Sequence, residues 1–137
     1  MNTHFAIAVH ALAVITYEGG GPVSAARIAD SVGTSPVFLR RVLADLRDAD
    51  LIAMRRGANG GAELLVDATA ISLADIYDAV TTNPLLSIHD APNPACAVGR
   101  GVGDALDVVV ATVEEDVRAR LAQRTVHQVL QEILAAR

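Results

Sequence analysis

The sequence predicts a mainly α-helical chain with one small β-hairpin. Apolar residues recur at helical spacing in most segments, capping residues stand before several of these segments, and glycines separate two short β-favouring runs. The chain has 137 residues, of which 52% are hydrophobic and 3% aromatic. We therefore expect an ordered protein with an aliphatic core, of the size of a single domain.

Two helices are expected at the start of the chain. Apolar residues follow helical spacing over residues 3–17, and the Glu-Gly-Gly-Gly-Pro run at 18–22 ends that helix. Ser24 stands where an N-cap belongs, before a second helix over 24–32. Gly33 supplies the left-handed residue that closes this second helix.

A third helix is expected over residues 36–49. Ser35 precedes it as an N-cap, and Pro36 takes the first helical position, where its missing N–H costs nothing. One apolar stripe of this helix should be buried, and it consists of Leu39, Val42, Leu43 and Leu46. Two short helices joined by a tight turn form the helix-turn-helix arrangement.

A β-hairpin should follow, with strands at residues 51–56 and 62–66 around a glycine-rich turn at 57–61. Asn59-Gly60 is the favoured pair for a tight hairpin turn, and the glycines are explained by positive φ angles. A phosphate-binding loop is the alternative, but it needs a helix after the glycines and usually a lysine, and the chain has no lysine. A hairpin directly after a helix-turn-helix is a wing.

Another short helix is expected after the wing, followed by a loop. Ser72 and Asp75 have the spacing of a capping box at the start of Ile-Ser-Leu-Ala-Asp-Ile-Tyr-Asp-Ala-Val. Residues 83–99 contain three prolines and predict a loop.

The chain should end in a long helix over 100–122 and a short one over 126–136, which Thr125 and Gln128 cap. The long helix offers more apolar surface than one small chain covers, which predicts a homodimer seam. This expected seam consists of Leu106, Val109, Val110, Val113, Val117 and Leu121. The expected organisation is a winged helix-turn-helix DNA-binding domain (1–82), a proline-containing loop (83–99) and dimerisation helices that pack with the N-terminal helix (100–137).

Charge and cysteine content limit the class of protein. Residues 1–66 hold equal numbers of arginines and acidic residues, so residues 67–137 carry the whole net charge of −5. A neutral module can still bind phosphates if its arginines share one face. Cys96 is the only cysteine, which excludes a disulfide within the chain and fits a reducing compartment. The apolar start lacks a basic segment and a cleavage site, so we expect a cytoplasmic protein with no membrane partner.

The second helix of a helix-turn-helix enters the major groove of double-stranded DNA, and its N-terminal part meets the base edges. Arg40 suits a bidentate contact with guanine, and Val37 suits a thymine methyl. Phosphate or backbone contacts are expected from the remaining candidates, which are Arg27, Thr34, Ser35, Pro36, Arg41, Arg55, Arg56, Asn59 and Gly60. The alternative is that Arg40 and Arg41 pair with nearby acids such as Asp45.

These segments resemble the Rrf-two (Rrf2) family of bacterial winged-helix transcription regulators. The resemblance rests on Ser-Ala-Ala-Arg-Ile-Ala-Asp-Ser-Val and the helix after it, on the Arg-Gly-x-x-Gly-Gly wing, and on the Ile-x-Leu-x-Asp-Ile segment. It covers most of the chain. It implies a homodimeric regulator, a repressor in our interpretation, that binds a pseudo-palindromic operator.

Some members of the family hold an iron–sulfur cluster on three cysteines in the loop before the dimer helix. This chain departs from that pattern, because residues 83–101 contain Cys96 alone, so we expect no cluster and no metal site. A thiol near a helix N-terminus has a lowered pKa, which makes Cys96 a candidate redox sensor. The alternative is a buried, inert cysteine.

Two other functions remain open at this point. The acidic balance fits a winged helix that binds proteins instead of DNA. A thiol-dependent enzyme with Cys96 as nucleophile is the third alternative, although no group that orients His89 as its partner can be identified.

Overall fold

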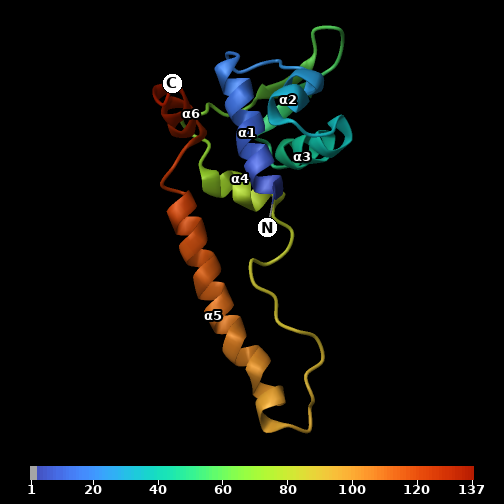
Figure 1. Cartoon of the computed structure of the whole chain (residues 1–137), viewed down its shortest axis with the longest axis vertical. Coiled ribbons are helices and arrows are strands. Elements are labelled where there is room, and N and C mark those ends of the chain that lie inside the picture. The colour runs from blue at the N-terminus through green and yellow to red at the C-terminus, as the bar shows by residue number, and fades with distance from the viewer. Residues whose placement is uncertain (1–2) are drawn as a thin grey trace.

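The computed structural model describes residues 3–137 and confirms the predicted fold class. Helices and one two-stranded antiparallel sheet form a body, from which one long helix projects together with a loop (Figure 1). The elements in chain order are α1 (Thr3–Tyr17), α2 (Ala25–Val32), α3 (Pro36–Asp48), β1 (Ile52–Arg55), β2 (Gly61–Leu64), α4 (Leu73–Val80), α5 (Ala97–Leu121) and α6 (Val126–Ala135). Of the domain expected over 1–82, residues 1 and 2 lie outside the described part.

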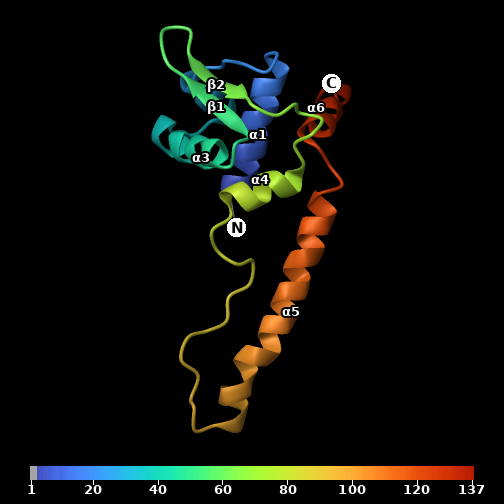
Figure 2. The same cartoon turned by 180° about the vertical axis from the view of Figure 1, so that it is seen from behind.

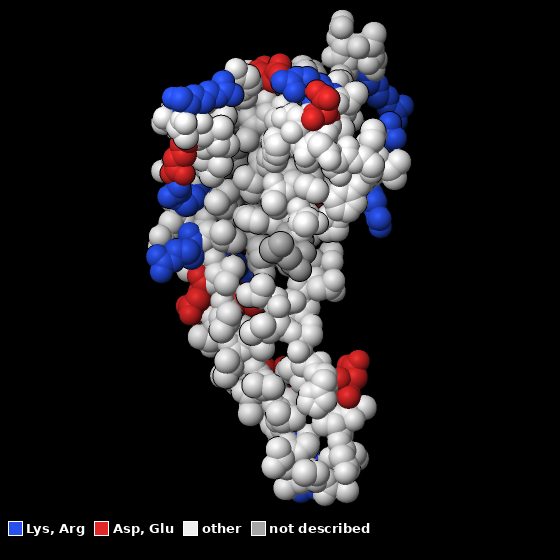
Figure 3. Space-filling model, in the orientation of Figure 1, with Lys and Arg blue, Asp and Glu red and all other residues white. Residues whose placement is uncertain are grey.

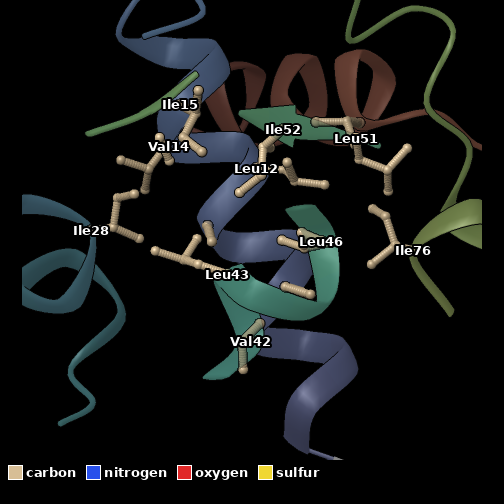
Figure 4. Close-up of a cluster of buried hydrophobic side chains, with 14 of the residues drawn as sticks. Leu12, Val14, Ile15, Ile28, Val42, Leu43, Leu46, Leu51, Ile52 and Ile76 are labelled. Carbon is tan, nitrogen blue, oxygen red and sulfur yellow. The ribbon is translucent and has the colours of Figure 1, made fainter. Parts of the chain in front are cut away.

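Helix α1 is the centre of the body and contacts α2, α3, α4, α6 and β2. Side chains from several elements converge on it, among them Leu12, Ile28, Leu43, Ile52 and Ile76 (Figure 4). The stripe predicted on α3 is confirmed, because none of its four residues is more than 2% exposed: Leu39, Val42, Leu43 and Leu46. This aliphatic packing fixes one face of α3 and leaves the opposite face at the surface.

The predicted caps set the ends of the two helices of the helix-turn-helix. The Ser24 hydroxyl accepts a hydrogen bond from the Arg27 N–H at 3.2 Å, and the Ser35 hydroxyl accepts one from the Phe38 N–H at 3.2 Å. Gly33 has a φ of 74° and ends α2 in the left-handed conformation, as predicted. The turn between α2 and α3 is therefore held at both ends by local hydrogen bonds.

The hairpin is confirmed, but its predicted turn is wrong. Arg55 pairs with Gly61, so the loop spans residues 56–60, and the Gly60 N–H donates to the Gly57 carbonyl at 3.0 Å. Ala58 and Asn59 are therefore the central pair of the turn, in place of Asn59 and Gly60. Gly60 is needed for another reason, because a Cβ there would lie 2.2 Å from the Arg55 carbonyl oxygen.

The wing is attached to the linker between α1 and α2. Val23 and Ala62 exchange backbone hydrogen bonds of 2.9 and 2.8 Å. Gly61 lies directly against this linker, since a Cβ would come within 2.1 Å of the Val23 carbonyl oxygen. Gly21, in the same linker, also lies close to β2, because a Cβ there would come within 2.4 Å of the Ala62 carbonyl oxygen.

Helix α5 begins at Ala97, earlier than the predicted residue 100, so the expected loop at 83–99 includes its first turn. The helix start was predicted too late because glycine is a poor helix former, and Gly99, Gly101 and Gly103 lie in the first turns of α5. Gly99 allows close packing, since a Cβ there would lie 2.4 Å from the Asn93 carbonyl oxygen. Within residues 3–137, no helix is long and apolar enough to cross a membrane.

Helix α6 returns to the body and packs against α1 (Figure 2). Its Val126 is fully buried in the same core as α1. The two predicted capping boxes lie side by side, because Leu73 donates to the Arg124 carbonyl at 2.8 Å and Val126 donates to the Ile71 carbonyl at 3.0 Å. The start of α4 and the start of α6 are thereby joined.

Candidate nucleic-acid interface

The exposed flank of α3 carries the residues predicted to contact bases. Val37 is 67% exposed, although it is an aliphatic residue on a helix whose other face is completely buried. Pro36, Arg40 and Arg41 are exposed on the same helix. The structure therefore presents an apolar contact point and two guanidinium groups in the N-terminal half of α3.

Arg40 and Arg41 form no ion pair with any acidic residue of the described chain. Asp45, the carboxylate considered as a partner for Arg41, is half-buried and takes part in no such pair. Both guanidinium groups are thus available to an external acceptor. A guanidinium carries five N–H donors in a planar fork that fits guanine or a phosphate.

The turn before α3 brings small polar groups to the same end of the helix. Ser35 is exposed, and its hydroxyl oxygen already accepts from the Phe38 N–H. Its O–H remains free to donate to a phosphate, because a hydroxyl both donates and accepts. Thr34 is half-buried, so it offers less surface than Ser35.

The wing brings a second group of arginines near the helix-turn-helix. Figure 3 shows basic side chains along the edge of the body where α3 and the wing lie. Arg55 Nε donates to Glu63 Oε1 across the hairpin at 2.6 Å, whereas Arg56 forms no ion pair within residues 3–137. Asn59 is exposed at the tip and Gly60 is half-buried. Arg56 is therefore the less constrained cation of the two.

Two predicted phosphate contacts have carboxylate partners that the sequence did not indicate. Besides the Arg55–Glu63 pair, Arg27 Nη2 lies 2.9 Å from Glu18 Oε1, which follows the end of α1. Both pairs join residues of different elements, and no local spacing rule connects them. They reduce the net positive charge of this surface.

The sequence reasoning also missed a contact that positions α3. The His4 ring of α1 stacks on the Phe38 ring with a centroid distance of 4.8 Å and an interplanar angle of 15°. No sequence signal links His4 to Phe38, since the two helices meet only in the folded chain.

The long helix α5 has no buried residue, although it has 25 residues. Of the six apolar residues predicted for the seam, Leu106 is 41% and Val109 is 53% exposed, and the others are half-buried: Val110, Val113, Val117 and Leu121. The single chain therefore leaves a partly uncovered apolar stripe on α5.

Cys96 stands at the N-cap position of α5 and is exposed, so the alternative of a buried cysteine is wrong. Its side chain makes no capping hydrogen bond. The backbone amides of Gly99 and Val98 nevertheless lower the pKa of the thiol. The position therefore favours the thiolate, as expected at a helix N-terminus.

Comparison with known proteins identifies the family of the chain. A model of the Rrf2 family, described as iron-dependent transcriptional regulators, matches residues 1–132. The chain belongs to the Rrf2 family. As a member of this family it is a DNA-binding transcriptional regulator.

Individual Rrf2-like proteins agree with this assignment. The chain is 36% identical over 131 residues to the HTH-type transcriptional regulator YwnA of Bacillus subtilis (strain 168), covering 95% of this chain and 96% of YwnA. A crystal structure described as a DNA-binding protein has 34% identity and a TM-score of 0.75, covering 93% of this chain and 98% of that one. The IscR structure from T. potens has 25% identity and a TM-score of 0.73, covering all of this chain and 90% of IscR.

Proposed function

We propose that this Rrf2 regulator is a homodimeric repressor that reads a pseudo-palindromic operator through α3. The observation that carries the proposal is the division of α3 into a fully buried stripe and an exposed flank with Val37, Arg40 and Arg41. A recognition helix needs this division, because one face must anchor it and the other must reach the bases. The wing steadies the contact on the phosphate backbone.

Selection of bound sequences from genomic DNA, followed by fluorescence anisotropy, tests the proposal. Arg40→Gln should relax the base preference at one operator position and cost about 1–3 kcal/mol. Arg41→Gln should weaken binding to all sequences about equally. Affinity should also fall steeply as salt rises, because phosphate contacts release counterions. If the wild type selects no sequence at physiological salt, the winged helix acts on another partner.

Dimerisation is proposed through α5. Its exposed residues Leu106 and Val109 begin a stripe that continues along the helix, and isolated apolar stripes of this length favour a helical partner. A further apolar groove lies between α1 and α6, with Phe5, Val9 and Ile133 in its lining. A dimer also places two α3 helices for half-sites one helical turn of DNA apart.

Sedimentation equilibrium tests this arrangement. Val109→Glu should shift the wild-type dimer towards monomer, since it puts a charge into the apolar seam. Val98→Glu is the matched control, because Val98 is 75% exposed and lies outside the predicted seam. A wild type that stays monomeric at micromolar concentration would rule out the dimer.

We further propose that Cys96 makes the regulator sensitive to oxidation. Two Cys96 thiols of a dimer and one peroxide would give one disulfide and two water molecules, with the sulfurs oxidised and the peroxide reduced. Exposure and the lowered thiol pKa support this role. Operator binding by wild type and Cys96→Ser, before and after peroxide treatment, tests it, and an equal response of both proteins would exclude Cys96 as the sensor.

We infer that this member of the family works in the cytoplasm without an iron–sulfur cluster. A cluster of the type held by three cysteines does not fit a chain with Cys96 alone. Among residues 3–137, moreover, no three His, Cys, Asp or Glu side chains are grouped to hold a metal ion. Iron analysis of protein purified without oxygen tests this, and stoichiometric iron with sulfide would contradict it.

A further inference from the structure

A hollow of about 220 Å³ lies between α1, α2 and α6, and no residue of α3 lines it. It is smaller than the pockets that hold drug-sized ligands, so any occupant has one ring or a short chain. The residues that line it are His10, Ala13, Val14, Tyr17, Arg27, Ser31, Leu130, Ile133, Leu134 and Arg137.

The floor of the hollow is apolar. Ala13 and Val14 of α1 and Leu130 of α6 are each at most 8% exposed, and Leu134 is half-buried beside them. No buried side-chain nitrogen or oxygen in the described chain lacks a hydrogen-bond partner. An occupant of the floor therefore needs an apolar surface and gains nothing from polar groups there.

The rim is polar and carries two guanidinium groups. Arg27 uses Nη2 for Glu18 and keeps further N–H donors, because a guanidinium has five. Arg137 forms no ion pair within residues 3–137, so its guanidinium keeps its N–H donors at the rim. His10 Nε2 lies 3.1 Å from Ser31 Oγ, which ties α1 to α2 at the same rim.

We propose that this hollow binds a small organic carboxylate whose apolar body lies on the α1–α6 floor and whose carboxylate contacts Arg27 and Arg137. A carboxylate accepts paired hydrogen bonds from guanidinium groups, and such charge-assisted bonds are about twice as strong as neutral ones. A neutral molecule of the same shape lacks them. The arrangement thus distinguishes an acid from its amide.

The ligand acts on DNA binding through Arg27, and this step rests on the proposed function. Arg27 lies in the first turn of α2 and is one of the phosphate contacts expected from the sequence. A bound carboxylate holds its guanidinium at the rim and competes with the phosphate. Because α6 forms the other wall and leads directly from α5, the same ligand also links the DNA-binding helices to the predicted dimer helix.

Isothermal titration calorimetry of the full chain without DNA tests the site itself. The probes are benzoate and hexanoate, with benzamide as the neutral match for benzoate. Benzoate or hexanoate should bind saturably and benzamide should not. Arg27→Gln should raise the Kd about tenfold or more, since it removes charge-assisted hydrogen bonds. Ser31→Leu, which fills the exposed mouth, should abolish binding.

Arg47→Gln is the control, because Arg47 is an exposed arginine on α3 that does not line the hollow. It should leave the Kd unchanged. Absence of saturable binding by both carboxylates overturns the proposal, and so does equal binding of benzamide or an equal loss in Arg47→Gln. Circular dichroism of each variant shows whether it is folded.

A second measurement, operator affinity with and without the binding carboxylate, tests the coupling. Operator affinity should fall about fivefold or more when the hollow is saturated, and Ser31→Leu should not respond. If the protein binds the carboxylate but selects no DNA sequence, the proposed function is wrong and the carboxylate site stands. If it binds DNA sequence-specifically but binds no carboxylate, the carboxylate site is wrong and the proposed function stands.

Discussion

Arg118 of α5 donates a hydrogen bond from Nε to the Asp78 carboxylate of α4 at 2.6 Å. Its guanidinium also lies 5.8 Å from the centre of the Tyr77 ring, and Tyr77 packs edge-on against Phe5 of α1. Within residues 3–137 this is the one ion pair between α5 and the rest of the chain. Asp78 stabilises the charged guanidinium and raises the pKa of Arg118. This contact is therefore one of those that join the long helix to the body.

Arg118→Met should lower affinity for a full operator and leave affinity for a single half-site unchanged. The substitution keeps the length of the side chain but removes the ion pair, so in the proposed dimer the spacing of the two α3 helices should be less fixed. The urea midpoint should change little, because exposed pairs add little to stability. Fluorescence anisotropy with full and half-site duplexes measures the difference.

Asp78→Asn is the control for this prediction. If the ion pair is the cause, Asp78→Asn and Arg118→Met should have similar effects, and the double variant should be no worse than either single one. Additive losses, or equal losses on the half-site, would show that Arg118 acts on DNA by another route.

Substitutions at Ser35 should separate helix capping from DNA contact. Ser35→Asp should keep the stability of α3, because aspartate caps as well as serine and also suits the helix N-terminus. It should nevertheless reduce operator affinity about tenfold or more, because the new charge repels a phosphate. Urea unfolding and anisotropy on the same sample measure the two effects.

Ser35→Ala gives the matched comparison. It removes the hydrogen bond from the Phe38 N–H, so it should destabilise the protein by about 1 kcal/mol. It adds no charge, so its operator affinity should exceed that of Ser35→Asp. If Ser35→Asp binds the operator with wild-type affinity, the start of α3 does not lie near the phosphate backbone.

The buried half of α3 was predictable from the sequence, and the ion pairs around it were not. Ser35, Pro36 and the spacing of Leu39 and Leu43 depend on local geometry, which a single chain segment determines. The Arg27–Glu18 pair depends instead on where α1 and α2 meet after folding. Long-range pairs of this kind have no period in the sequence.

The wing and the start of α5 show the same limit in the backbone. The glycine run indicated a turn, but the linker that packs against Gly61 decides the register of the loop. Gly99 lowered the expectation of a helix, whereas its contact with Asn93 explains why a glycine is required there. Close packing of backbones can place a glycine where propensity alone argues against the element.

Alanine substitutions at two wing glycines should differ in their effect. Gly57 has a φ of 109° and no atom within 4 Å of its would-be Cβ, so Gly57→Ala should cost only backbone strain, about 1–2 kcal/mol. Gly61→Ala should cost about 3 kcal/mol or more, because the new methyl meets the Val23 backbone. Urea unfolding measures both.

The two variants also test how the wing is attached. In Gly61→Ala the Val23–Ala62 hydrogen bonds should open, so amide exchange at Val23 and Ala62 should accelerate, while Gly57→Ala should leave it near the wild-type rate. Equal protection of these amides in both variants would mean that the linker yields to the methyl group and that the wing does not depend on the close approach at Gly61.

The Cys96 thiol should react with iodoacetamide at lower pH in the folded protein than in urea. The amides of Gly99 and Val98 lower the pKa of the folded thiol below its ordinary value, which unfolding restores. Because the folded pKa is the lower one, the contribution to stability is present above the unfolded pKa and is lost as pH falls through the folded pKa. The alkylation rate should therefore reach half its plateau at a lower pH in buffer than in urea, with Cys96→Ser as the blank for other nucleophiles. Coincident profiles in buffer and urea would show that the α5 terminus does not stabilise the thiolate, and the redox role proposed for Cys96 would lose its chemical basis.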